Sequence, residues 1–112
     1  MKRNHMDFFE ISKKEASKSH HDRFFHGSVT VHRNTVIGKG CNRNRIHAEV
    51  SSIKNIHNYF KYENLVVYVC RINRRGGFMM SKPCCNCMAF MKKQGVSKVY
   101  YSDEDGFSKL IL

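Results

Sequence analysis

Four side chains in this 112-residue sequence have types and spacing that suit metal chemistry. His47 and Glu49 are two positions apart, and Pro83 introduces Cys84 and Cys87 later in the chain. One imidazole and two thiolates give a zinc ion three protein ligands, and a catalytic zinc keeps its fourth position open. The sequence therefore predicts a catalytic Zn²⁺ site held by the histidine and the two cysteines.

The Glu49 carboxylate is not needed as a ligand, which leaves it available for proton transfer. A catalytic zinc lowers the pKa of a bound water from near 16 to roughly 7, so that hydroxide is present at neutral pH. Glu49 would take the proton of that water and return it to the substrate, acting first as a base and then as an acid. We therefore expect Glu49 to be the catalytic residue.

Two other interpretations of the cysteines stay open. A Cys-x-x-Cys pair can be redox-active, although the preceding proline and the lack of a thioredoxin-like context argue against this. The zinc could also be structural, with Cys41, Cys70 or Cys85 as a fourth ligand. We expect these three cysteines to be small buried hydrophobic residues instead.

Three predicted helices surround these side chains. Residues 6–19 have amphipathic spacing, and a second helical pattern over 46–60 begins with the histidine and glutamate in its first turn. Pro83 opens a third helix and Gly95 ends it. Both cysteine ligands then lie in a first turn, where the helix dipole favours thiolates.

Five strands are predicted at residues 28–32, 35–39, 65–70, 96–102 and 107–112. Arg33 and Asn34 form a hairpin turn between the first two strands. The third strand is almost wholly apolar, as in a strand covered on both faces. The pattern predicts an α/β fold with a mixed sheet, forming one domain of residues 1–112.

The net charge of +11 indicates an affinity for phosphates, on a nucleotide or on a nucleic acid. A solvated basic surface is the alternative. The N-terminal sequence has no long apolar run, so we expect no signal peptide, no membrane span and no membrane partner. Five cysteines without an export signal predict a reducing compartment, with the cytoplasm as the default location.

The spacing His-x-Glu followed by Pro-Cys-x-x-Cys is the signature of zinc-dependent nucleobase deaminases. Along nearly its whole length the chain resembles the cytidine deaminase-like superfamily, and residues 31–43 resemble a hairpin of bacterial tRNA adenosine deaminases. The resemblance implies a three-layer α/β/α fold with a mixed five-stranded sheet. It also implies hydrolysis of an exocyclic amine to a carbonyl, with release of ammonia.

The same resemblance implies roles for residues around the metal. Asn42 matches an asparagine that hydrogen-bonds the sugar, the Ala48 backbone would contact the base, and Pro83 would shape the pocket. An aromatic residue beside the base would be Tyr101 or its neighbour Tyr100, since only one of them can face the pocket.

Arg74 and Arg75 precede the proline-cysteine turn and are candidates for holding a phosphate near the pocket. The alternative is a solvated loop that turns at Gly76 and Gly77.

Two features of the resemblance point to different substrates. The short turn after Ser102 predicts that the last two strands form an antiparallel hairpin, as in nucleoside cytidine deaminases. The five-residue step from Asn42 to His47 is similar to that of some AID/APOBEC-type polynucleotide deaminases. We expect conversion of cytosine to uracil in a free cytidine or deoxycytidine nucleoside or nucleotide, by a homo-oligomer.

Two alternatives to this expectation stay open. One is a deaminase of bases in single-stranded DNA or RNA, including adenosine in tRNA. The other is a non-catalytic, basic nucleic-acid-binding module with a structural zinc.

Overall fold

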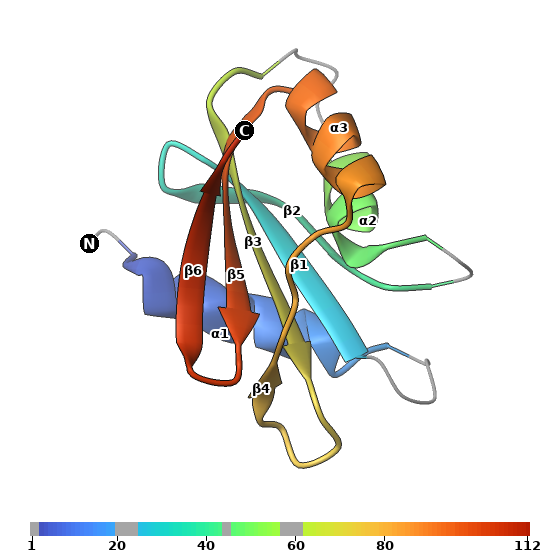
Figure 1. Cartoon of the computed structure of the whole chain (residues 1–112). Helices are drawn as coiled ribbons and strands as arrows, with labels where there is room; N and C mark the ends of the chain where they lie inside the picture. The colour runs from blue at the N-terminus through green and yellow to red at the C-terminus, as the bar shows by residue number, and fades with distance from the viewer. Residues whose placement is uncertain (1–2, 20–24, 44–45, 57–61) are drawn as a thin grey trace.

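The computed structural model describes residues 3–19, 25–43, 46–56 and 62–112. Within them, the helices and strands follow one another in the expected order, with one additional short strand (Figure 1). In chain order the elements are α1 (His5–Ala16), β1 (Phe25–His32), β2 (Thr35–Cys41), α2 (Ala48–Lys54), β3 (Leu65–Ile72), β4 (Phe78–Met79), α3 (Cys85–Lys93), β5 (Val96–Asp103) and β6 (Gly106–Ile111).

The strands form one mixed sheet in the order β2-β1-β3-β5-β6, with the additional strand β4 paired to β3. β3 and β5 are parallel, and the other neighbouring pairs are antiparallel. The predicted hairpin of the last two strands is confirmed, since Ser102 lies opposite Phe107 and Asp103 lies opposite Gly106. The five predicted strands are therefore present, and β4 extends the sheet beside β3.

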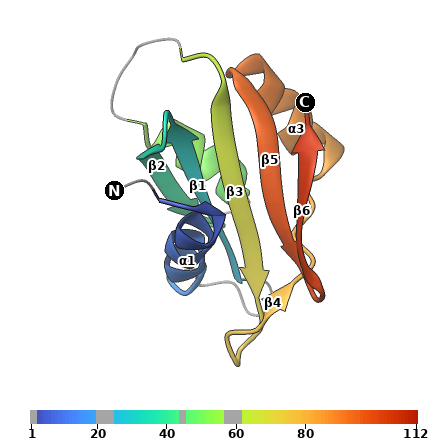
Figure 2. The same cartoon turned by 90° about the vertical axis from the view of Figure 1, so that its left-hand side faces the viewer.

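Helices cover both faces of the sheet, with α1 on one face and α2 and α3 on the other (Figure 2). β3 is buried between these two layers, as its apolar sequence predicts. Tyr68 and Cys70 belong to the core under α1, whereas Val67 and Val69 belong to the core under α2 and α3. This alternation follows from the two-residue period of a strand. The expected three-layer α/β/α fold is confirmed.

The first helix is fixed at its N-terminus by a capping box. The Asp7 N–H donates to the Asn4 side-chain oxygen at 3.0 Å, and the Asn4 N–H donates to the Asp7 carboxylate at 2.9 Å. These bonds satisfy two amides and start the helix one residue before its predicted bound. The helix also ends earlier than predicted, at Ala16, and Ser19 bonds to Asn42 instead of continuing it.

Two connections use backbone conformations that few residues adopt. Arg33 and Asn34 have φ angles of 48° and 67°, so the predicted β1–β2 turn forms without glycine in a conformation that matches the twist of a hairpin. Gly95 has a φ of 95°, and a Cβ there would lie 2.2 Å from the Tyr62 carbonyl oxygen. Glycine is therefore required where α3 meets β5, as the sequence predicts.

The second helix is shorter than the predicted pattern. It ends at Lys54, followed by the cap residue Asn55, and Phe60 lies outside the described residues. No helix in the described parts of the chain is long and apolar enough to cross a membrane.

Candidate metal centre and active site

Three side chains from two helix starts meet at one point of the structure. The His47 Nδ1 atom lies 3.0 Å from Cys87 Sγ and 3.8 Å from Cys84 Sγ. All three ligand atoms lie within 4.8 Å of one another. The expected convergence of this histidine and the two cysteines is therefore present.

The N-termini of α2 and α3 position these groups. His47 is the N-cap residue of α2, and Cys84 is the N-cap residue of α3, whose third residue is Cys87. The Cys87 N–H donates to Cys84 Sγ at 3.5 Å, so the sulfur also serves as the helix cap. Pro83 is buried and precedes the cap, so the prediction that proline opens the helix is wrong by two positions.

The spacing of the donor atoms fits a zinc ion. Tetrahedral coordination with bonds of about 2.1 Å to nitrogen and 2.3 Å to sulfur places donor atoms roughly 3.5 to 3.8 Å apart. His47 Nδ1 lies 3.0 and 3.8 Å from the two sulfurs, and the three donor atoms all lie within 4.8 Å of one another, so side-chain shifts of about 1 Å or less bring them into this range. A zinc ion held there supplies Lewis acidity and lowers the pKa of water.

Glu49 lies in the first turn of α2 and is only 3% exposed. Burial raises the pKa of its carboxyl, and a backbone hydrogen bond, His47 and the Cys87 thiol offset part of that rise. A carboxyl with a raised pKa holds a proton more readily near neutral pH, as a group that both accepts and donates a proton must do.

The environment of Cys87 differs from the sequence expectation. Burial raises the pKa of its thiol, and the neighbouring Glu49 and Cys84 raise it further. The helix terminus was expected to favour the thiolate, whereas desolvation of this residue, which is only 4% exposed, is the largest cause of the raised pKa. A divalent cation reverses this balance because it binds the deprotonated sulfur.

Two buried serines anchor the chain that leads into the cysteines. Ser81 Oγ lies 3.1 Å from the Val69 carbonyl oxygen and 3.0 Å from Ser102 Oγ. The Ser102 N–H donates to Ser81 Oγ at 2.7 Å, and Ser102 Oγ donates to the Met79 carbonyl at 2.8 Å. These bonds tie residues 79–81 to β3 and β5, and they fix the segment just before Cys84.

We predict that Ser81→Ala weakens zinc binding by up to about 10-fold, the lower end of the loss expected when a group bonded directly to a metal ligand is removed. The variant leaves the buried Ser102 N–H without its acceptor, so the segment before Cys84 loosens. Competition with a chelating dye measures the affinity. Ser97→Ala on β5, the strand of Ser102, is the control, because the Ser97 Oγ bond to the Leu65 carbonyl is long, at 3.4 Å. Equal losses in both variants would contradict the prediction.

The residues that the resemblance assigns to substrate binding are close in sequence to the metal ligands. Ala48 is fully buried between His47 and Glu49. Asn42 follows β2, and its side-chain oxygen accepts from Ser19 Oγ at 2.7 Å and from the His26 N–H at 3.0 Å. Asn42 is therefore held by the segment that follows α1 and by the start of β1, and its contact with a sugar stays a prediction.

The two tyrosines face opposite sides of the sheet. Tyr101 packs against the core cluster that contains Cys87, so it lies in the same layer as the metal ligands. Tyr100 stacks on Tyr68 with ring centroids 4.9 Å apart and also contacts His5, on the α1 face. Of the two, Tyr101 is on the side that could reach a base.

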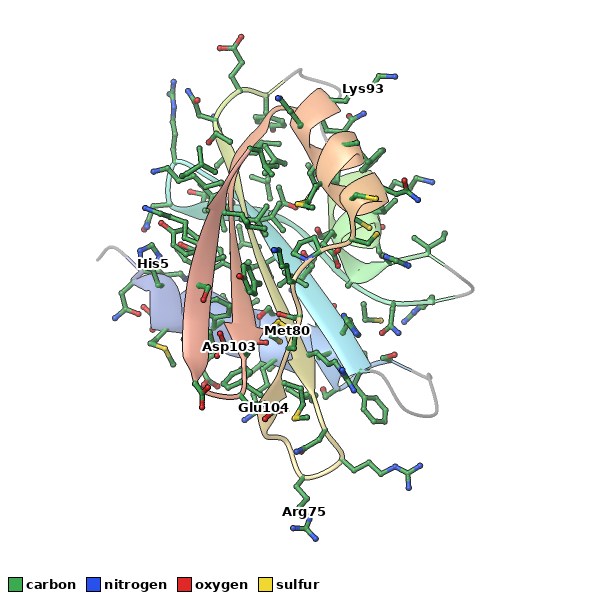
Figure 3. The ribbon with its side chains drawn as sticks, viewed as in Figure 1. His5, Arg75, Met80, Lys93, Asp103 and Glu104 are labelled. Carbon is green, nitrogen blue, oxygen red and sulfur yellow. The ribbon has the colours of Figure 1, made fainter. Side chains whose placement is uncertain are left out.

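Arg74 and Arg75 are not brought together with the metal ligands. They lie in the turn between β3 and β4, and they line a cleft with residues of α1. Figure 3 shows Arg75 at the tip of this hairpin. The pairing of β4 with β3 directs the turn away from the cysteines, which the sequence did not reveal.

The remaining cysteines separate into two groups. Cys41 and Cys70 are buried, as expected, and burial raises the pKa of the Cys70 thiol to about 11. Cys85 is exposed, so the expectation that it is buried is wrong. It is the first residue of α3, and the sheet-facing side of that helix is occupied by Cys87 and Met91.

Sequence analysis missed the serine pair that supports the cysteine segment. It also missed the buried trio on the α2 side, in which Ser52 Oγ lies 3.1 Å from Ser28 Oγ and 2.9 Å from Thr30 Oγ1. The available signal was the alternation of small hydroxyl residues with valines in residues 28–31, which marks a strand with a polar face under a helix.

Solved deaminase structures share this fold. The dCMP deaminase of cyanophage S-TIM5 aligns with a TM-score of 0.70 at 16% identity, covering 86% of this chain and 79% of its own. A tRNA:A34 deaminase has a TM-score of 0.68 at 24% identity, with coverage of 86% and 74%. The cytidine deaminase of Mycobacterium tuberculosis has a TM-score of 0.64 at 18% identity, with coverage of 94% and 89%.

A fold of this type with a histidine and two cysteines at adjacent helix starts has the architecture of a zinc-dependent deaminase. Residues 2–103 match the model of the cytidine and deoxycytidylate deaminase zinc-binding region, and the chain belongs to this family. None of the curated proteins matches the sequence.

Proposed function

We propose that this protein hydrolyses the exocyclic amine of cytosine in a free nucleoside or nucleotide, giving uracil and ammonia. The observation that carries the proposal is the buried Glu49 carboxyl beside the cluster of His47, Cys84 and Cys87. A structural zinc site needs no such carboxyl, whereas a hydrolytic site needs a group that moves protons. Zinc held by the cluster would serve this hydrolysis.

In the proposed reaction, water adds to C4 of the base and the C4–amine bond breaks. Glu49 accepts one proton from the water and delivers it to the ring nitrogen N3. A second proton, from the added hydroxyl, passes through the same carboxylate to the leaving amine, so that ammonia departs and the C4 carbonyl forms. Asn42 would bind the sugar, the Ala48 backbone and Pro83 would contact the base, and Tyr101 would lie beside the ring.

Two observations support a small substrate. The antiparallel β5–β6 hairpin is the arrangement expected for a nucleoside deaminase. A solved structure of the cyanophage dCMP deaminase, 15% identical with a TM-score of 0.68, is a complex with dCMP and dUMP. The net charge of +11 instead favours a second candidate, deamination of a base within single-stranded DNA or RNA.

Ammonia release by the zinc-loaded protein tests both candidates. We expect turnover of cytidine, deoxycytidine or dCMP, with a rate that changes little between about 50 and 200 mM salt for an uncharged nucleoside. Turnover restricted to single-stranded DNA or tRNA, falling steeply with salt, would establish the second candidate. Zinc binding at one equivalent without turnover on any of these would contradict both.

Self-association is also part of the proposal. β6 is an edge strand of the sheet, and its residues Phe107 and Ile111 are 37% and 66% exposed. Exposed apolar side chains on an unpaired edge favour association with another copy. Light scattering of the zinc-loaded protein would show a mass above the 13.1 kDa monomer. A monomer at micromolar concentration would refute it.

A further inference from the structure

A second candidate site lies between α1 and the turn that joins β3 to β4. The cleft there has a volume of about 560 Å³, within the range of ligand-binding pockets. Phe25 and Ile72 supply its apolar lining. The cleft is on the α1 side of the sheet, whereas the metal ligands are on the α2 and α3 side, so the proposed reaction leaves it without a role.

The charged residues of the cleft are mostly cations. Lys13 and Lys14 of α1 lie on one side, Arg74 and Arg75 of the turn lie on the other, and Glu10 is the only acid among the lining residues that the structure describes. Cations thus outnumber acids among the described lining residues, which favours a positive field that the walls of the cleft concentrate.

Local contacts hold the two sides of the cleft in place. The Asn73 side-chain oxygen accepts from the Arg75 N–H and the Gly77 N–H, each at 2.9 Å, which fixes the turn. Lys13 Nζ lies 5.3 Å from the centre of the Phe78 ring, so the lysine reaches from α1 to the β4 strand. The cations of the helix and of the turn are therefore presented together.

Several of these cations have no acidic partner in the described part of the chain. The salt bridge found there joins Lys18 to Glu15 at 2.8 Å, and it involves neither Lys13, Lys14 nor Arg75. Like charges gathered in one cleft repel one another, and an anion bound between them would relieve the repulsion.

We propose that this cleft binds the phosphate backbone of single-stranded nucleic acid. Cations on both sides of an open groove suit a charged chain that passes between them, and the Phe25 ring offers a surface on which a base can stack. The overall charge of +11 would draw such a polyanion to the protein. This site goes beyond the proposed deamination, since binding there needs neither zinc chemistry nor Glu49.

Fluorescence anisotropy of labelled single-stranded DNA and RNA, each of about 20 nucleotides, tests the proposal on the zinc-loaded protein. We expect Lys13→Ala/Lys14→Ala to weaken binding at least about 10-fold at 0.1 M salt. The slope of log K against log salt should fall by about 0.7 for each lost phosphate contact. Arg75→Ala should weaken binding in the same direction from the other side of the cleft.

A matched control comes from α3, whose last turn also carries two lysines. Lys92→Ala/Lys93→Ala removes the same charge from the last turn of a helix, and Figure 3 shows Lys93 at the far end of the molecule from Arg75. Its affinity should stay within about 3-fold of the wild type, apart from the uniform effect of net charge. Equal weakening by both double variants would overturn the proposal, because it would mean that charge alone is responsible.

Two further measurements, of activity and of competition, distinguish this site from the catalytic one. Zinc content and turnover of a small substrate should be unchanged in Lys13→Ala/Lys14→Ala. If neither the wild type nor any variant showed deaminase activity, the proposed function would fail, but the binding measurements would still test this proposal. Millimolar dCMP or inorganic phosphate should not displace the oligonucleotide. Displacement by either one would show that the cleft takes a free phosphate or a mononucleotide, and the nucleic-acid proposal would be wrong.

Discussion

Glu49→Gln should lower turnover by about 10²- to 10⁴-fold while the protein keeps its fold and its zinc. The amide has almost the shape of the carboxylate, so it fits a position that is only 3% exposed. It has no lone pair basic enough to take a proton from water at neutral pH, and it has no acidic proton to give to the departing amine. We therefore expect only the rate of the chemical step to fall.

Three measurements on the same preparation separate this role from a structural one. Ammonia release reports turnover, elemental analysis reports zinc, and thermal unfolding reports the fold. Glu104→Gln in the exposed β5–β6 turn makes the same chemical change away from the cluster and should leave all three unchanged. If Glu49→Gln lost the metal, the carboxylate would be supporting the ligands; if it kept full activity, another group would move the proton.

Much of the site could be predicted because its residues depend on local sequence. His47 and Glu49 belong to one helix start, and Cys84 and Cys87 belong to another. A helix start exposes its amides, and two residues three apart, such as Cys84 and Cys87, share one face, so residue type and spacing describe much of such a site without knowledge of the fold. The same is true of the turn at Asn34, because a short hairpin needs positive φ angles.

Other features depend on contacts between distant segments, which spacing does not encode. Ser81 and Ser102 meet because the chain after β4 passes beside the end of β5. Arg74 and Arg75 lie away from the cysteines because β4 folds back on β3. Register and strand pairing decide such positions.

The sheet face on which Tyr100 and Tyr101 each lie could be predicted only in part. Strand periodicity predicted that they face opposite sides, but the side of each depended on which helices cover which face. The buried cores decide the face of each residue, since Tyr101 packs against the core cluster that contains Cys87, and Tyr100 stacks on Tyr68.

Replacing the cysteines one at a time gives the second large expected effect. Cys84→Ser and Cys87→Ser should each reduce bound zinc from about one equivalent to far less, because a neutral hydroxyl is a much poorer zinc ligand than a thiolate. Cys85→Ser should keep its zinc. Its sulfur is exposed between the two ligands in sequence, and it is not part of the cluster that can hold a metal in the described residues. The three variants therefore differ in position and not in chemistry.

The thermal stability of each variant should depend on how much zinc it binds. With free zinc at 100 times its dissociation constant, binding stabilises the fold by about 2.7 kcal/mol, which corresponds to roughly 10 °C in Tm for a domain of this size. Adding a chelator should remove that increment from the wild type and from Cys85→Ser. It should change Cys84→Ser and Cys87→Ser little, because they hold little zinc to lose. A chelator-sensitive Tm in either of these two, or equal zinc loss in all three variants, would show that the ligand set is different.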